Sequence, residues 1–279
     1  MSRAACLCNA VRWETSGPLE WMSHCHCSRC RKKHGTAFGT YVAAPLESVR
    51  VEGSEHIVHW ESSPGFYRCF CRHCGAVTPG EPVEGKAFLP AGGFLEDPEA
   101  RPLAHIFTAS KAPWYALCDQ LPAFAAYPEG LGGPVQPDRP PLDPPGKTRG
   151  SCMCGGVAFT IEGEILRARY CHCSRCRRAR SAAHAANLAI AAGGLRFTRG
   201  AELVARYKLP EAQHFAQAFC RTCGSTLPCV YAERDIAVVP MGALDDDPGV
   251  RPDCHIFVGS KAPWFEIADA LPQHAEYPP

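Results

Sequence analysis

Cysteine is the residue type that most restricts the chemistry of this chain, because 18 of its 279 residues are cysteines and most recur in one spacing. The spacing C-x-C, then C-x-C-x-x-C, then C-x-x-C occurs twice, at Cys6, Cys8, Cys25, Cys27, Cys30, Cys71 and Cys74, and again at Cys152, Cys154, Cys171, Cys173, Cys176, Cys220 and Cys223. Thiolates suit zinc, and a closed tetrahedral site takes four of them. Seven cysteines per copy therefore predict one closed zinc site and one zinc with three protein ligands, whose open position could support catalysis.

The two-cysteine units at the ends of each copy are expected to form the closed sites, because one unit alone has too few ligands. This pairing predicts two outer sites, made of Cys6, Cys8, Cys71 and Cys74 and of Cys152, Cys154, Cys220 and Cys223. Gly75 and Gly224 follow the last cysteines and can take the left-handed conformation that turns amide N–H groups towards the sulfurs. Zinc bound there would stabilise the fold directly. The alternative, buried thiols without metal, does not explain the repeated spacing.

The C-x-C-x-x-C units, called the triplets below, are the candidate catalytic sites: Cys25, Cys27 and Cys30, and Cys171, Cys173 and Cys176. Three sulfurs within six residues can face one metal and leave its fourth position to water or a substrate thiol. Two alternatives stay open. His34 or His184 could close the site as a fourth ligand, or the triplet could be a redox centre without metal. His26 and His172 lie between ligands, and we expect them beside the metal rather than on it.

The chain is a tandem duplication. The offset between the copies is 146 residues at the first two cysteine units and 149 at the third, and it is 150 at His105-Ile-Phe and Ser110-Lys-Ala-Pro-Trp. This period far exceeds that of solenoid repeats, so each copy should be a domain. We expect domains at residues 1–127 and 150–279, each with its own core, joined by a proline-rich linker at 128–149.

Composition excludes several functional classes. Hydrophobic residues make up 46% of the chain and charged residues 20%, and the net charge is +1, which gives no overall attraction to nucleic acid or anionic membrane. No apolar run approaches the roughly 20 residues of a membrane helix, and the first cysteine comes too early for a signal peptide. We therefore expect a cytoplasmic protein, in which clustered cysteines indicate metal sites more readily than disulfides.

Short alternating segments predict a mainly-β fold. They include residues 50–52, 56–60, 157–161 and 203–207, which are separated by Gly, Pro and Ser clusters typical of antiparallel sheets. One helix per copy is predicted after the Pro-Trp pair, over residues 113–121 and 263–271, because each segment begins with proline and ends before another.

In combination, these motifs resemble the glutathione-dependent formaldehyde-activating enzyme family, which includes centromere protein V. The resemblance rests on C-x-C, Cys-His-Cys-Ser-x-Cys-Arg, Phe-Cys-x-x-Cys-Gly and His-Ile-x-x-x-Ser-Lys-Ala-Pro-Trp, and it covers nearly all of both copies. It implies an all-β, Mss4-like β-tent fold in two copies. It also implies two zincs per domain, four per chain, with a structural zinc on the outer four cysteines and a catalytic-type zinc on each triplet.

The activity that the resemblance implies is zinc-dependent and of the carbon–sulfur lyase type. The thiol of glutathione and the aldehyde formaldehyde would form an S-hydroxymethyl adduct, with no membrane and no nucleic acid involved. Zinc could deprotonate the bound thiol, although a zinc-bound thiolate is a weaker nucleophile than a free one. The alternative function is a non-catalytic, zinc-stabilised module that binds protein or nucleic acid.

Basic residues crowd both triplets. Arg29, Arg31 and Lys32, and Arg175 and Arg177, are candidate contacts for the carboxylates of glutathione, with a solvated basic face as the alternative. Lys33, Arg178 and Arg180 lie in the same runs. His105, Lys111 and Trp114 are expected to serve packing and capping. Copy two has Ser181 and His184 where copy one has Gly35 and Phe38, so unequal activity of the copies is predicted if this segment shapes the pocket.

Overall fold

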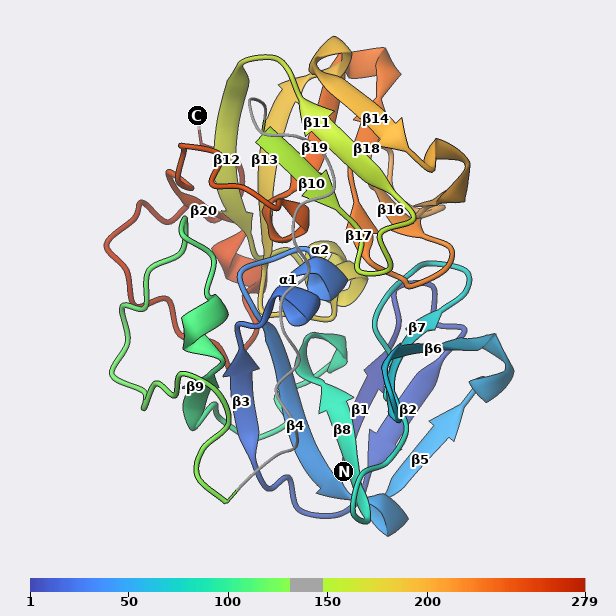
Figure 1. The fold of residues 1–279 in the computed structure, drawn as a ribbon. Helices are drawn as coiled ribbons and strands as arrows, with labels where there is room; N and C mark the ends of the chain where they lie inside the picture. Colours follow the sequence, from blue (N-terminus) through green and yellow to red (C-terminus); the bar gives the residue numbers. More distant parts are fainter. Residues whose placement is uncertain (131–147, 279) are drawn as a thin grey trace.

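The computed structural model describes residues 1–130 and 148–278, and it is mostly β-structure. The two copies lie against each other, with copy one in blue to green and copy two in yellow-green to red (Figure 1). Helices α1 (Ser28–His34) and α2 (Ser174–Arg180) lie where the copies meet. Most of the predicted linker, residues 131–147, is outside the described residues, and its last two residues, Thr148 and Arg149, already belong to strand β10.

Copy one is built from small sheets. The triplet lies on a four-stranded sheet of order β8-β4-β3-β9, in which β3 pairs in parallel with β9. The strands of this sheet are β3 (Met22–Cys25), β4 (Gly39–Pro45), β8 (Lys86–Pro90) and β9 (Ala104–Ile106). The remaining strands are β1 (Ser2–Ala5), β2 (Arg12–Thr15) and β5 (Val49–Glu52) in one sheet, and β6 (Ile57–Ser63) with β7 (Phe66–Cys71) in another.

Copy two repeats the arrangement. Its triplet lies on the sheet of order β18-β19-β13-β12-β20, with β12 parallel to β20. The strands of this sheet are β12 (Ile165–Cys171), β13 (Ala185–Ala191), β18 (Cys229–Tyr231), β19 (Ile236–Pro240) and β20 (His255–Ile256). The other sheets contain β10 (Thr148–Ser151), β11 (Ala158–Ile161) and β14 (Leu195–Arg199), and β15 (Val204–Lys208), β16 (Ala216–Cys220) and β17 (Thr226–Leu227).

Single 3₁₀ turns connect many strands. They are η1 (Leu46–Ser48), η2 (Ser54–His56), η3 (Ala91–Gly93), η4 (Thr108–Ser110), η5 (Ala192–Gly194), η6 (Ala201–Leu203), η7 (Ala232–Arg234), η8 (Met241–Ala243) and η9 (Val258–Ser260). The mainly-β prediction is confirmed, and the four predicted strand segments fall in β5, β6, β11 and β15 or within one residue of them. In the described residues, no helix is long and apolar enough to cross a membrane.

The predicted helices at 113–121 and 263–271 are wrong, because these segments form turns and irregular chain. Their polar groups are used elsewhere: Asp119 Oδ1 accepts from Leu121 N, and Lys111 Nζ donates to the carbonyl of Tyr115. The segment then returns to pair with β9, where His105 N donates to Pro122 O at 2.8 Å. An irregular connection that leads into this pairing therefore takes the place of the local helix that the prolines suggested.

The α-helices instead begin at the triplets. Cys27 and Cys173 are the N-caps, and their sulfurs accept from the backbone N–H groups of Cys30 and Cys176 at 3.4 and 3.3 Å. Both helices end at a residue in the left-handed conformation, Gly35 or Ser181. In each copy the connection between two neighbouring strands therefore forms a short helix, and a cysteine side chain caps its first turn.

One hydrophobic cluster runs through both copies, so the cores of the two copies are continuous. The contact is reciprocal at the glycines after each C-x-x-C. A Cβ on Gly75 would lie 2.3 Å from the Phe219 ring, and a Cβ on Gly224 would lie 2.4 Å from the Phe70 ring. Phe70 and Phe219 meet with their ring centroids 6.2 Å apart. The two copies are therefore packed around each other with pseudo-twofold symmetry.

Candidate metal centres

The outer cysteines come together as predicted. The sulfurs of Cys6, Cys8, Cys71 and Cys74 all lie within 4.8 Å of one another, and so do those of Cys152, Cys154, Cys220 and Cys223. Individual Sγ–Sγ distances are 3.5 Å for Cys6 to Cys8, 3.6 Å for Cys8 to Cys71 and 3.8 Å for Cys154 to Cys220. A Zn–S bond of about 2.3 Å in a tetrahedron gives sulfurs about 3.8 Å apart. The donor set therefore fits zinc, and the described cysteines form no disulfide.

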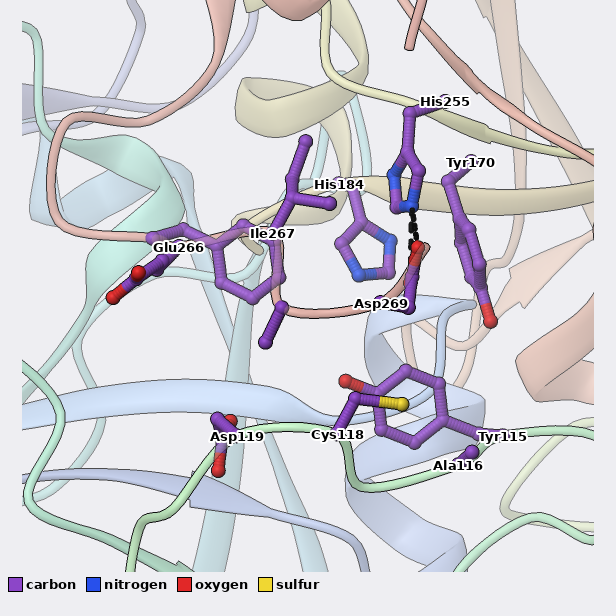
Figure 2. Close-up of a pocket in the computed structure, with 12 residues that line it drawn as sticks. Tyr115, Ala116, Cys118, Asp119, Tyr170, His184, His255, Glu266, Ile267 and Asp269 are labelled. Atoms are coloured by element: carbon purple, nitrogen blue, oxygen red, sulfur yellow. Dashed lines mark hydrogen bonds and ion pairs between the residues drawn. The ribbon is translucent and has the colours of Figure 1, made fainter. Parts of the chain in front are cut away.

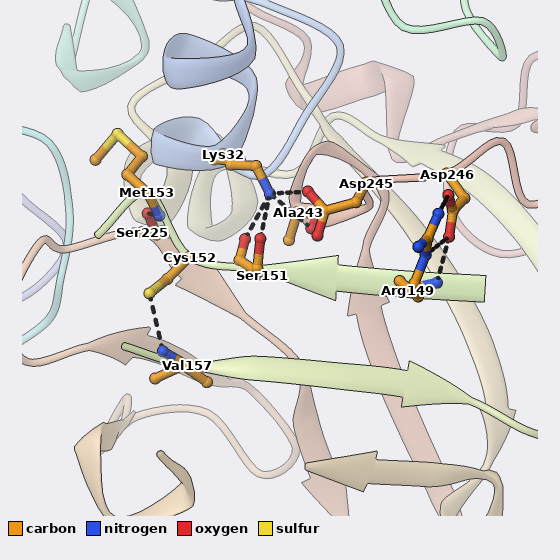
Figure 3. A network of polar contacts seen from close by, with 10 residues as sticks. All are labelled: Lys32, Arg149, Ser151, Cys152, Met153, Val157, Ser225, Ala243, Asp245 and Asp246. Carbon is orange, nitrogen blue, oxygen red and sulfur yellow. Dashed lines mark hydrogen bonds and ion pairs between the residues drawn. The ribbon is translucent and has the colours of Figure 1, made fainter. Parts of the chain in front are cut away.

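Backbone amides support these sulfurs from more places than expected. Gly75 and Gly224 are left-handed as predicted, with φ of 72° and 67°, but their N–H groups donate to the carbonyls of Cys71 and Cys220. The sulfurs of Cys6 and Cys152 accept instead from Val11 N at 3.3 Å and Val157 N at 3.2 Å. Figure 3 shows the second of these contacts. The N–H group of Cys74, in the turn that Gly75 completes, also bonds to the sulfur of Cys71, so the residues after C-x-C and the glycine turn both support the sulfurs.

The triplets also form compact groups. Cys25, Cys27 and Cys30 have their sulfurs within 4.8 Å of one another, as do Cys171, Cys173 and Cys176. Cys25 ends β3, Cys27 caps α1 and Cys30 lies in its first turn, so strand and helix together position the three donors. In the part of the chain that the structure describes, no His, Asp or Glu joins either group. This donor set fits a zinc ion with an open position.

The two histidines considered as fourth ligands are used elsewhere. His34 Nδ1 lies 2.7 Å from the carbonyl of Arg180, and its Nε2 lies 2.9 Å from Tyr41 Oη. His184 Nδ1 lies 3.3 Å from Thr36 Oγ1, and its ring meets Phe38 edge-on across the boundary between copies. Burial lowers the pKa of both His34 and His184 to about 3, so both rings are neutral at physiological pH.

His26 and His172, between the cysteines, each begin a buried chain of hydrogen-bonding side chains. His26 Nε2 lies 2.9 Å from His105 Nδ1, and His105 Nε2 lies 2.9 Å from Asp119 Oδ1. The same chain in copy two joins His172, His255 and Asp269. Burial lowers the pKa of His26 to about 3. The role of the two aspartates was missed, although the internal repeat (Asp119 and Asp269, offset 150) was a signal for it.

A pocket on the boundary between copies collects residues from both (Figure 2). It is lined by Tyr115 and Cys118 from copy one and by Tyr170, His184 and Asp269 from copy two. The ring of Phe38 lies 5.5 Å from that of Tyr115 and 6.0 Å from that of Phe265. Phe38 and His184 therefore take part in the contact between copies, and each ring also lies 5.3 Å from the histidine between the triplet cysteines of its own copy, His26 or His172. Unequal activity of the two copies stays a prediction.

Part of the expected basic face is buried. Lys32, predicted to contact glutathione, is buried and points towards residues of copy two (Figure 3). Its Nζ donates to Ser151 O at 2.8 Å, Ser151 Oγ at 2.9 Å and Asp245 Oδ1 at 2.6 Å. Lys33 is also buried, with Nζ 4.4 Å from the centre of the Phe70 ring, and burial lowers its pKa to about 7. Lys32 is thus part of the contact between copies, and the prediction that it binds a substrate is wrong.

Arg178, which corresponds to Lys32 with the offset of 146, makes the equivalent contact from copy two to copy one. Arg178 Nη2 donates to the carbonyl of Cys6 and to Asn9 Oδ1, both at 2.5 Å. Each triplet helix therefore docks on the outer cysteine site of the other copy. Arg175 is exposed and Arg29 is partly exposed, whereas Arg177 Nε donates to Ser260 O at 2.9 Å. These arginines and Arg31 stay candidates for contact with an anionic thiol.

Two further arginines lie at the triplets. Arg68, on β7, donates from Nη1 to Cys30 Sγ at 3.7 Å. Burial opposes its charge, but the thiolates of Cys30 and Cys27 raise the pKa of Arg68 above its ordinary value. In copy two the arginine is Arg180, at the end of α2, whose pKa burial lowers to about 10 against the opposing effect of Cys176. Sequence reasoning gave Arg68 no role and counted Arg180 only among the basic runs.

The fold and sites define a mainly-β protein with four thiolate-rich clusters suited to zinc, two per copy. The model of the family described as glutathione-dependent formaldehyde-activating enzyme matches residues 1–110 and 147–260. The chain therefore belongs to this family, with the family's domain present twice.

Two further comparisons were made. The crystal structure of a Rhodobacter sphaeroides protein, a structural-genomics target, is 31% identical over 37% of this chain and 97% of its own, with a TM-score of 0.30. Among curated proteins, no significant match was found.

Proposed function

We propose that the triplets are the active sites of a zinc-dependent enzyme of the carbon–sulfur lyase type, which joins glutathione to formaldehyde. In the forward direction a bond forms between the thiol sulfur and the aldehyde carbon, and the thiol proton ends on the former carbonyl oxygen. The product is S-hydroxymethylglutathione, and the reverse reaction breaks the same carbon–sulfur bond. The observation that carries the proposal is the three-cysteine cluster without a fourth protein donor among the described residues, in a family that bears this activity in its name.

The residues have distinct parts in this proposal. Cys25, Cys27 and Cys30 would hold the zinc in copy one, and Cys171, Cys173 and Cys176 in copy two. Zinc, when bound, would lower the pKa of a thiol at its open position. The outer cysteine sites would stabilise the fold and hold the other copy's triplet helix in place.

Substrate carboxylates would be contacted from the rim of each triplet. The partly exposed Arg29 and Arg31, and the exposed Arg175, are the contacts that we propose. Arg177 can contribute only the part of its guanidinium that does not donate to Ser260. A guanidinium binds a carboxylate with two parallel hydrogen bonds, which suits the carboxylates of glutathione.

Metal analysis combined with kinetics tests the function. Purified protein should contain four zincs per chain, and replacing Cys25, Cys27 and Cys30 by serine should leave three and lower the rate of glutathione-dependent formaldehyde consumption. Cys118→Ser is the matched control, because Cys118 is an exposed cysteine outside the four clusters. It should change neither quantity. Formaldehyde consumption that is unaffected by glutathione in the four-zinc protein would reject the proposal and favour the alternative, a zinc-stabilised binding module.

A further inference from the structure

The two copies carry an arginine near the triplet at different positions of the repeat. Position 68 in copy one corresponds to position 217 in copy two, with the offset of 149, and the residues are Arg68 and Gln217. Position 34 corresponds to position 180, with the offset of 146, and the residues are His34 and Arg180. Each copy thus has arginine at one of the two positions and a different polar residue at the other.

In copy one the positively charged residue near the triplet is Arg68, on β7. Arg68 Nη1 lies 3.7 Å from Cys30 Sγ, and its buried Nε has no hydrogen-bond partner among the described residues. His34, at the alternative position, is neutral and bonds to Tyr41, whose hydroxyl lies 2.9 Å from its Nε2. Tyr41 itself lies in the field of the three thiolates, and burial together with these charges raises its pKa well above its ordinary value.

In copy two the positively charged residue near the triplet is Arg180, on α2 four residues after Cys176. The side chain of Arg180 is 8% exposed, and its Nη2 donates to Asn187 Oδ1 at 3.3 Å. Asn187 is the residue that corresponds to Tyr41, so the partner has changed together with the arginine. Buried Nη1 of Arg180 has no hydrogen-bond partner in the described part of the chain. Gln217 instead donates to the carbonyl of Ala179 at 2.7 Å, which ties it to the helix backbone.

Charge balance explains why each site needs such a residue. Three thiolates and one divalent zinc ion carry a net charge of −1, and a fourth, anionic ligand makes it −2. In a buried site an uncompensated charge is costly, so a nearby guanidinium stabilises the state with the anion bound. Arginine stays protonated and keeps free donors for that anion.

We infer that Arg68 and Arg180 are equivalent anion-recognition residues, one per triplet, which select an anionic fourth ligand such as a substrate thiolate. The inference rests on the proposed function in naming a thiolate as that ligand. Because Arg68 approaches from β7 and Arg180 from α2, the two triplets present the same charge from different directions.

The test uses two anions on a protein with one working triplet. Cys171, Cys173 and Cys176 are replaced by serine, the remaining triplet is loaded with Co²⁺, and its visible spectrum is titrated with azide and, separately, with glutathione. Arg68→Gln installs the residue that copy two has at this position. It should weaken the binding of both anions about 10- to 100-fold, the range expected for losing a charge-assisted contact. Arg50→Gln, which removes an exposed charge of the same sign, should change neither affinity.

A second variant tests whether the residues of copy two restore anion binding in copy one. His34→Arg with Tyr41→Asn, added to Arg68→Gln, reproduces the arrangement of copy two and should recover most of the lost azide affinity. Azide affinity within twofold of the parent in Arg68→Gln, or no azide binding by the parent at all, would overturn the inference. If azide behaves as expected while glutathione leaves the parent spectrum unchanged, the inference holds for anions and the proposed function fails.

Discussion

Replacing Lys32 by methionine should lower the free energy of unfolding by about 3–5 kcal/mol, because it leaves a buried carboxylate without its partner. The exposed fractions are 9% for the Lys32 side chain and 6% for that of Asp245, and the two charged groups are 2.6 Å apart. Lys32 also donates to the carbonyl and hydroxyl of Ser151 and to the carbonyl of Ala243, so four acceptors lose their donor at once. Methionine keeps most of the aliphatic volume, so the loss should come mainly from charge and hydrogen bonding.

The assay is urea unfolding at fixed free zinc, followed by tryptophan fluorescence. A double-mutant cycle with Asp245→Asn isolates the ion pair from the other contacts. The double variant should lose at least 2 kcal/mol less than the sum of the two single variants, because removing both charges leaves neither one buried alone. The Co²⁺ spectrum of the first triplet should broaden in Lys32→Met, since Lys32 and Cys30 share helix α1.

The corresponding residue of copy two supplies a matched control. Arg178 docks on copy one through the carbonyls of Cys6 and Leu7 and the side chain of Asn9, all of them neutral acceptors. Arg178→Met should therefore cost less, about 1–3 kcal/mol, because only neutral acceptors lose their donor. A loss below 1 kcal/mol in Lys32→Met, or a coupling energy near zero in the cycle, would refute the idea that this ion pair holds the copies together.

Three further predictions concern pH, packing and metal. His184 has a pKa of about 3 in the folded state, below its unfolded value of about 6.5, so the unfolded chain binds more protons between these values and stability falls as pH decreases through this window. His184→Phe, the residue that copy one has here, should reduce that pH slope by up to about 1.4 kcal/mol per pH unit, and an unchanged slope of melting temperature between pH 4 and 6 would contradict it. Gly224→Ala should lower the free energy of unfolding, measured with urea, by about 2–4 kcal/mol. The reason is that the new Cβ would lie 2.4 Å from the Phe70 ring, at a backbone φ of +67°. No change in stability would show that the contact between copies adjusts easily. Removing zinc with a chelator should unfold most of the sheet structure seen by circular dichroism, because binding at the outer sites is folding energy, and a native spectrum without metal would argue against it.

The reciprocal docking changes how the duplication is understood. Helix α1 carries Cys30 and also Lys32 and Lys33, which contact copy two beside its outer cysteines. Metal loss at the outer site of one copy is therefore expected to disturb the triplet of the other. Two identical chains could form the same contact as a dimer. Fusing them allows each side to change separately, as Lys32 with Asp245 on one side and Arg178 with Asn9 on the other illustrate.

The sequence alone determined which cysteines come together and the fold class. C-x-C and C-x-x-C are local units whose geometry depends on a few neighbouring residues, and counting to four ligands grouped them correctly. The strand at 50–52 was likewise predictable, because alternation along a partly buried strand is visible in consecutive residues. The strand at 157–161 also formed, although all of its residues in β11 are buried. The tandem repeat indicated that both copies would have the same fold and the same cysteine clusters.

Only the tertiary structure decided where the helices and the charged residues of the sites lie. Proline at position 113 favoured a local helix, but that segment forms turns and irregular chain leading into the pairing of residues 122–124 with His105, and the helix formed instead at the cysteine cap of the triplet. The basic run around Lys32 was compatible with a surface that faces solvent, but in the structure Lys32 and Lys33 are buried against copy two. Arg68 reaches Cys30 from 38 residues away in the chain. Such contacts depend on how distant segments pack, and no local spacing encodes that packing.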